Sequence, residues 1–149
     1  MNNLELLKQL REETAAGILD IKNALEAAGG DIKQARDILR QKGFDKAVAK
    51  EGREVKAGLV ESYVHNGGRV GSIIVLACET DFVARLDEFK ALAHEIAMQV
   101  ASMDPQSLDE LLEQPYIRDS AKTIRDLITE VVAKTRENIK LVDYKRFQI

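Results

Sequence analysis

The pattern of apolar positions in the first 44 residues predicts three short helices. The second apolar segment stops at Gly29-Gly30, a pair typical of a helix end. Asp31 is a good N-cap for the third segment, which we expect to end at Gly43. Three helices of this length make a bundle small enough to depend on a neighbour for stability. The second helix is expected to carry on its core stripe Ile18, Ile21, Leu25 and Ala28.

Leu19 does not fit that packing. At about 100° per residue, its side chain points well away from the core stripe and lies next to the loop at Thr14–Gly17. We therefore expect Leu19 to be exposed. Single exposed leucines are common in folded proteins, so helix geometry favours an ordinary surface residue and leaves a contact with a partner as the alternative.

Residues 42–57 are expected to form a connecting helix with one basic edge. Acidic residues offset part of that charge, and a solvated face is the ordinary outcome of such spacing; an RNA-binding stripe is the alternative. The whole chain has 22 basic and 25 acidic residues and a formal charge of −3, which excludes the global basic field that dominates non-specific nucleic-acid binding. We expect no direct nucleic-acid partner. The basic edge consists of Lys42, Lys46, Lys50, Arg53 and Lys56.

Beyond the connecting segment, the pattern changes to that of strands. Two segments rich in Val, Ile and Tyr, at 59–65 and 69–79, flank Asn66-Gly67-Gly68, which is a strong hairpin signal. Residues 139–149 return to strand-like spacing after a further helical segment. We therefore expect an α+β fold, in which a helical bundle is followed by a small antiparallel sheet packed with helices.

A long amphipathic helix is expected from Asp87 to Met103. Its apolar stripe must pack on the sheet, whereas Met98 lies on the opposite side and needs a second layer or another subunit to cover it. A sheet of about three strands has too few elements around it to cover both faces. A two-fold homodimer, with Met98 or the open face of the 71–78 strand at its contact, is compatible with this pattern; so is a monomer in which residues 116–149 fold back over the sheet. The apolar stripe holds Phe89, Leu92, Ala93, Ile96, Val100 and Met103.

Residues that carry chemistry are few. Cys78 is the single cysteine, which suits a reducing compartment, and its apolar strand favours a small buried side chain over a reactive thiol. His65 and His94 have no Cys, His or carboxylate at metal-ligand spacing, and no nucleophile or phosphate-loop motif is present. We expect no enzyme, no cofactor and no metal. No apolar run approaches the roughly 18 residues of a membrane span and no targeting peptide is evident, so we expect a cytoplasmic protein without a membrane partner.

The adjacent carboxylate and aromatic ring of Asp81-Phe82, directly after an apolar strand, have no local explanation. The stretch that contains them belongs to a series of separated motifs that occur in order along almost the whole chain. Together these motifs resemble bacterial translation elongation factor Ts. They include LREETAAGILD at 10–20, YVH at 63–65, CETDFVAR at 78–85, LAHEIAMQ at 92–99 and ENI at 137–139.

The chain departs from the family pattern at five places. Val142-Asp143-Tyr144-Lys145 replaces a more arginine-rich terminal strand, and Ile18-Leu19 replaces the family's usual Met-Met pair. The segment between Pro105 and Pro115 is very short, where many members insert a second core subdomain or a helical hairpin. The family's tight Thr-Gly-Ala-Gly loop is here Thr14-Ala15-Ala16-Gly17, and Thr135-Arg136 replaces the Ile-Gly that usually precedes Glu-Asn-Ile.

The resemblance implies a ubiquitin-associated-like bundle at 1–44, a linker helix at 45–57 and an α+β core of the family's dimerisation type at 58–149. It implies a guanine nucleotide exchange factor that binds the GDP-bound and nucleotide-free forms of elongation factor Tu. In the family, the Phe of the Thr-Asp-Phe-Val turn enters an apolar pocket of that partner, the Asp fixes its position, and the nucleotide's Mg²⁺ and phosphate site is disturbed. GDP then leaves and GTP can enter. The partner-binding residues implied are Thr14, Gly17, Ile18, Leu19, Thr80, Asp81, Phe82 and Val83.

Two other classes of function stay open at this stage. The bundle's likeness to ubiquitin-associated domains allows a general protein- or peptide-binding adaptor, and the basic edge allows an RNA-binding protein. Neither class explains residues 80–85. An RNA binder is expected to lose affinity steeply with ionic strength, whereas apolar contacts are not.

Overall fold

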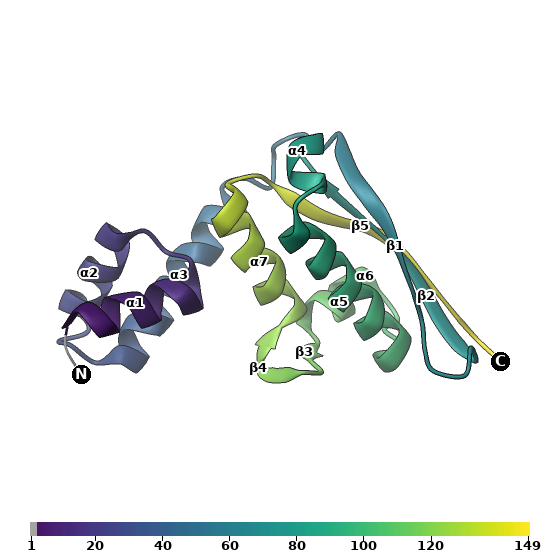
Figure 1. Cartoon of the computed structure of the whole chain (residues 1–149), viewed down its shortest axis with the longest axis horizontal. Helices are drawn as coiled ribbons and strands as arrows, with labels where there is room; N and C mark the ends of the chain where they lie inside the picture. Colours follow the sequence, from purple (N-terminus) through teal and green to yellow (C-terminus); the bar gives the residue numbers. More distant parts are fainter. Residues whose placement is uncertain (1–2) are drawn as a thin grey trace. The chain divides into compact units, whose positions relative to one another are not determined.

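The computed structural model of the chain describes residues 3–149. These residues form two compact units, the first ending at Lys50 and the second running from Glu51 to Ile149 (Figure 1). The first unit holds α1 (Asn3–Thr14), α2 (Ile18–Ala27) and α3 (Ile32–Val48). The second holds β1 (Ala57–Val64), β2 (Val70–Cys78), α4 (Asp81–Ala84), α5 (Asp87–Met103), α6 (Leu108–Glu113), β3 (Pro115–Tyr116), β4 (Asp119–Thr123), α7 (Ile124–Thr135) and β5 (Ile139–Gln148).

The three helices of the first unit enclose a small apolar core, as the sequence predicted. Asp31 caps α3 by accepting a hydrogen bond from the backbone N–H of Gln34 (2.9 Å). The stripe predicted for α2 is wrong at one end, because Ile18 is 50% exposed at the first turn of the helix. Ala24 takes a place in the core that the pattern did not assign to it. The buried core residues are Leu10, Ile21, Ala24, Ala28, Ala35 and Leu39.

The third helix does not end at Gly43, and this prediction was wrong. It runs on to Val48, because one glycine inside a helix costs only about 1 kcal/mol and the added turn makes contacts. The ammonium groups of Lys42 and Lys46 lie 3.2 and 2.7 Å from the Asp20 carboxylate on α2. No separate linker helix at 45–57 is formed, since residues 45–48 belong to α3 and residues 49–56 lie outside any helix.

The second unit is built on an antiparallel sheet with strand order β1-β2-β5. β1 and β2 form the predicted hairpin, and Gly67 and Gly68 at its turn have φ of +87° and +69°, which glycine adopts without steric cost. β5 pairs with the other edge of β2. The predicted α+β fold with a small antiparallel sheet is confirmed.

Helix α5 is exposed along one side of its first half and buried on all sides over residues 96–101. One side packs on the sheet, with Phe89 and Ile96 fully buried, as predicted. Met98 is also buried, because the segment between β3 and β4 covers it: the Arg118 guanidinium lies 3.3 Å from the Met98 sulfur. A second layer of the same chain therefore covers Met98, which removes this residue from any contact between chains. Met103, expected in the core stripe, is 45% exposed at the end of the helix.

The β3–β4 hairpin, which the sequence pattern missed, is fixed to α5 by polar contacts. The Tyr116 hydroxyl donates a hydrogen bond to the Glu95 carboxylate. Burial, together with this carboxylate, raises the pKa of Tyr116 to about 12. The buried Gln99 donates to the carbonyl of Pro115 (3.0 Å) and accepts from the N–H of Ile117 (3.1 Å).

All the helices of the second unit lie on one side of the β1-β2-β5 sheet (Figure 1). Residues 116–149 do not cover the other side, because α7 packs against α5 and β5 joins the edge of the sheet. The uncovered side, called the open sheet face below, displays apolar side chains at exposures between 41 and 70%. These side chains are Val60, Val64, Ile73 and Phe147.

Candidate partner-binding site

The segment Thr80–Ala84, called the exchange turn below, follows directly on β2. It forms a single helical turn, α4, and Thr80 is its N-cap: the Thr80 hydroxyl oxygen accepts a hydrogen bond from the N–H of Val83 (3.4 Å). Val83 and Ala84 are buried, whereas Phe82 is 76% exposed. The short helix is therefore amphipathic, and its buried side holds the Phe82 ring outward.

The backbone below Phe82 is fixed by a residue distant in sequence. One oxygen of the Glu137 carboxylate accepts hydrogen bonds from the N–H groups of Glu79 (3.1 Å) and Thr80 (2.9 Å), and the other accepts from the Thr80 hydroxyl (2.7 Å). A single exposed aromatic residue is ordinary on a protein surface. On a backbone held in this way, the position of an exposed ring is set before any partner arrives.

Cys78 packs inside the fold beneath the exchange turn. Its side chain is fully buried, and its sulfur lies 3.2 Å from the Thr80 carbonyl oxygen. Burial raises the pKa of the Cys78 thiol. The thiolate form is therefore disfavoured, and the prediction of a small buried side chain is confirmed.

The loop Thr14–Gly17, called the N-terminal loop below, and the first turn of α2 carry the other predicted residues. The Thr14 hydroxyl donates to the Leu10 carbonyl oxygen and accepts from the N–H of Ala16 (3.3 Å), so it fixes the loop locally. Gly17 is the N-cap of α2 and offers no side-chain cap. Leu19 is 71% exposed, which confirms the exposure inferred from helix geometry.

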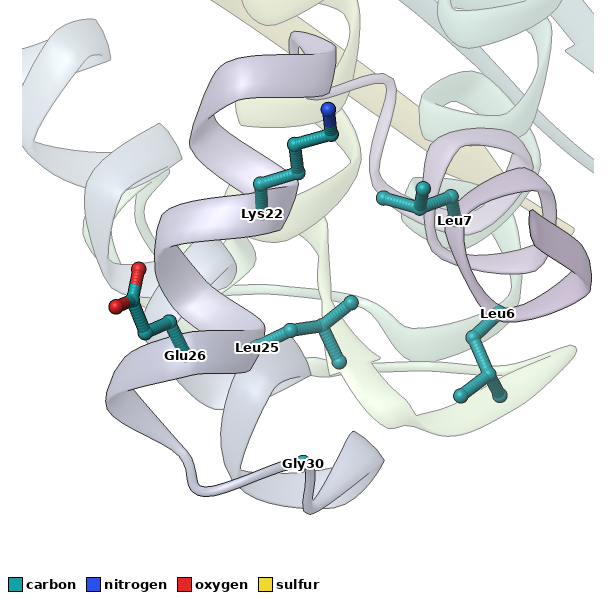
Figure 2. Close-up of a pocket in the computed structure, with 6 residues that line it drawn as sticks. All are labelled: Leu6, Leu7, Lys22, Leu25, Glu26 and Gly30. Carbon is teal, nitrogen blue, oxygen red and sulfur yellow. The ribbon is translucent and has the colours of Figure 1, made fainter. Parts of the chain in front are cut away.

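A groove of about 360 Å³ lies between α1 and α2 of the first unit (Figure 2). Leu6, Leu7 and Leu25 form its apolar part. Lys22 extends from α2 toward the groove, whereas the carboxylate of Glu26 points away from α1. Ile18, Lys22 and Leu25 follow each other at helical spacing of four and three residues, so Ile18 lies on the groove side of α2.

The structure brings the predicted residues together as two sets, one in each unit. Thr14, Gly17, Ile18 and Leu19 form the first, and the exchange turn forms the second. Val83 does not contribute to the surface, because it is only 3% exposed. The sequence-based prediction missed Glu137, whose one signal was its place in the Glu-Asn-Ile motif.

The part of the chain from residue 3 onward contains no group of three or more His, Cys, Asp or Glu side chains able to hold a metal ion. His94 is half exposed, with its Nδ1 at 3.4 Å from the Glu61 carboxylate and its ring edge-on to Tyr63 at 5.7 Å. Within the same residues, none of the helices combines the length and apolar character needed to cross a membrane.

Comparison with known proteins assigns the chain to a family. A family model described as elongation factor TS matches residues 79–149, a span that includes the exchange turn and Glu137. Elongation factor Ts of Thermotoga petrophila is 41% identical, covering 99% of this chain and 96% of the relative. The protein of the same description from Carboxydothermus hydrogenoformans is 39% identical, covering 97% and 88%. That from Caldanaerobacter subterraneus is also 39% identical, covering 99% and 96%.

These alignments extend over 190 to 193 positions, whereas this chain has 149 residues. The relatives therefore contain residues that this chain lacks, although the alignments reach almost from end to end. At this identity and coverage, the chain belongs to the elongation factor Ts family.

Proposed function

We propose that this protein is a guanine nucleotide exchange factor for elongation factor Tu. Membership of the elongation factor Ts family assigns it a role in translation elongation. The observation that carries the finer proposal is the exchange turn, where Phe82 is 76% exposed on a backbone fixed from below. The protein binds the GDP-bound and nucleotide-free forms of its partner and acts in the cytoplasm.

Phe82 supplies most of the binding energy at the exchange turn. Burying a phenyl ring in an apolar pocket of the partner is worth roughly 1.5–3 kcal/mol, which makes it a hot spot. Asp81, which is exposed beside it, fixes the ring's position through polar contacts. Occupation of the pocket displaces the partner's elements that hold Mg²⁺ and the phosphates of GDP. No covalent chemistry of this chain is needed.

The first unit supplies a second contact to the same partner. Ile18 and Leu19 are 50 and 71% exposed at the start of α2, and the N-terminal loop sets where that helix begins. In this proposal, residues 1–44 act as a ubiquitin-associated-like module and residues 58–149 as the family's α+β core. Lys42 and Lys46 are paired with the Asp20 carboxylate. Because this pairing offsets part of the charge of the basic edge, it supports a protein partner over RNA.

Release of labelled GDP from elongation factor Tu tests the proposal. The protein is expected to accelerate release in proportion to its concentration, at both low and moderate salt, because apolar contacts are weakly screened. GDP release at the spontaneous rate would contradict exchange activity. Binding of this protein to RNA, with an affinity that falls steeply as salt is added, would instead favour an RNA binder.

We also propose that the open sheet face joins two copies of the chain. Val60, Val64, Ile73 and Phe147 lie on a sheet face that the rest of the second unit leaves uncovered, and the exposed Asp143 and Lys145 share this face. A two-fold axis would pair that face with itself. Light scattering at micromolar concentration is expected to give twice the 16.6 kDa of one chain, and Val60→Lys is expected to give the monomer. A wild-type mass of one chain, independent of concentration, contradicts the dimer.

A further inference from the structure

We propose that Glu137 is a positioning residue for nucleotide exchange: through Thr80 it sets where Asp81 and Phe82 stand, without touching the partner itself. This inference rests on the proposed exchange function. It assigns a role to a residue that lies 57 positions from Thr80 in the sequence and belongs to neither set of predicted partner-binding residues.

Glu137 and Glu79 extend the strand pairing beyond the end of the sheet. The ladder between β2 and β5 ends at the pair Cys78 and Ile139. Past that pair, the Glu137 carboxylate accepts from the N–H groups of Glu79 and Thr80, and the Glu79 carboxylate accepts from the N–H of Asn138 (2.7 Å). Each chain segment is thus held by the other's carboxylate, through charge-assisted hydrogen bonds that are stronger than neutral ones.

A relay of hydrogen bonds leads from Glu137 to the exchange turn. The Thr80 hydroxyl has one proton, which it donates to Glu137 (2.7 Å). Its oxygen then accepts from the N–H of Val83 (3.4 Å), the bond that begins α4. Glu137 therefore selects the Thr80 rotamer that caps the helix. Phe82 lies between the two residues joined by that cap, so its direction follows from the cap.

The segment that carries Glu137 is itself held in place. Asn138 is buried, and its side-chain amide donates to the carbonyl oxygens of Arg53 (2.8 Å) and Glu51 (3.4 Å). The Arg53 guanidinium also lies 3.5 Å from the Glu79 carboxylate. The Glu137 carboxylate is consequently fixed before the partner binds, which is the condition for a residue to position a binding group.

The test measures GDP release from elongation factor Tu by the full chain carrying Glu137→Ala, Phe82→Ala or both. Glu137→Ala is expected to lower the exchange rate about fivefold, because the ring of Phe82, the hot-spot residue, would be misplaced. In the Phe82→Ala background, the same change is expected to have no further effect, because Glu137 acts through the ring. Glu130→Ala is the matched control, since Glu130 is a partly buried glutamate of α7 with one ion pair, to Lys122.

Backbone amide hydrogen exchange supplies a readout that does not depend on activity. Glu137→Ala is expected to speed exchange at the amides of Glu79 and Thr80, and to leave the amides of the central strand β2 unchanged. Glu137→Gln keeps the side-chain volume and one acceptor oxygen, so it tests the same bonds in a protein that folds. A smaller loss of activity and of amide protection is expected for it.

Three results would overturn the inference. The first is a wild-type rate of GDP release by Glu137→Ala. The second is a loss of rate from Glu137→Ala that is as large in the Phe82→Ala background as in the wild type. The third is unchanged protection of the Thr80 amide. A wild-type protein that fails to release GDP overturns the proposed exchange function instead. The two failures are therefore distinguishable.

Discussion

The N-terminal loop leads into the exposed Ile18 and Leu19 of α2, and the exchange turn carries the exposed Phe82, but the two segments are fixed differently. Among residues 3–149, the hydroxyl of Thr14 makes hydrogen bonds only to residues two and four positions away. Thr80, by contrast, is held by Glu137, 57 positions along the chain. A site fixed by near neighbours can be inferred from local pattern, whereas a site fixed by a distant strand depends on the completed fold.

Both sites also lie beside a strained backbone position. Ala15 and Arg136 have φ of +54° and +61°, a left-handed conformation that costs a non-glycine residue about 1 kcal/mol or more. These are the positions at which the chain carries Ala and Arg where the family pattern has glycine. The left-handed backbone accounts for the glycine that the family resemblance implies at each place.

The largest effect is expected from removing the ring at the exchange turn. Phe82→Ala should lower the rate of GDP release from elongation factor Tu by about tenfold or more, because it removes a hot spot and leaves the core intact. Stopped-flow fluorescence of labelled GDP measures the rate. Phe44→Ala, at a partly exposed phenylalanine of the first unit, is the control. A folded Phe82→Ala variant with the wild-type rate would refute the role of the ring.

A smaller effect is expected at the N-terminal site. Leu19→Asp should weaken binding to elongation factor Tu about fivefold, because a carboxylate would be forced into an apolar contact. Calorimetry gives the affinity, and Leu4→Asp, at another exposed leucine of the same unit, serves as control. Equal affinities of Leu19→Asp and wild type would make Leu19 an ordinary surface residue.

The strained position next to Glu137 should respond to glycine. Arg136→Gly is expected to raise the free energy of unfolding by about 0.5–1 kcal/mol, since relief of left-handed strain exceeds the added entropy of the unfolded chain. Denaturant unfolding measures this change. Lys134→Gly, within helix α7, should instead destabilise by about 1 kcal/mol. Equal losses for both variants would show that Arg136 is not strained.

The smallest effect is expected from removing the ion pairs that Asp20, next to Leu19 on α2, makes with Lys42 and Lys46. The ammonium groups of Lys46 and Lys42 lower the pKa of the Asp20 carboxyl. Its stabilising contribution is therefore present above the unfolded-state pKa of about 4 and is lost as pH falls through the lower folded-state pKa. Asp20→Asn should cost at most about 0.5 kcal/mol at pH 7.

Unfolding experiments on Asp20→Asn at pH 7 and at pH 2.5 check that sign. The difference from wild type should shrink at the lower pH, where the unfolded state no longer ionises Asp20. It should also shrink with added salt, because both lysines are about half exposed. A difference that grows on acidification would contradict the assigned cause of the shift.

Elements defined by short-range pattern were predicted from the sequence. The hairpin at Asn66-Gly67-Gly68, helix α5 and the exposure of Leu19 each follow from spacing, turn residues or helix geometry. The end of α3 was not predicted, because the ion pairs of Lys42 and Lys46 with Asp20 stabilise a helical turn that Gly43 alone would weaken.

The elements that the sequence did not predict depend on distant contacts. The β3–β4 hairpin is short, and its hold on α5 comes from Gln99 and Glu95, which carry no periodic signal. Glu137 likewise looks like any glutamate after a helix until the β2–β5 pairing places it beside Thr80. The residues proposed to face the partner could be named from the sequence, through the family resemblance, whereas Glu137, which we propose positions them, could not.

The most direct test of the central claim is the reciprocity of binding to elongation factor Tu. If this protein promotes GDP release by favouring the nucleotide-free partner, GDP must weaken its binding by the same factor by which it weakens GDP. Its affinity should be measured for the nucleotide-free and GDP-loaded partner, and the affinity of GDP with and without it. The account predicts two equal ratios, both well above one. Equal binding to the two forms of the partner would contradict it.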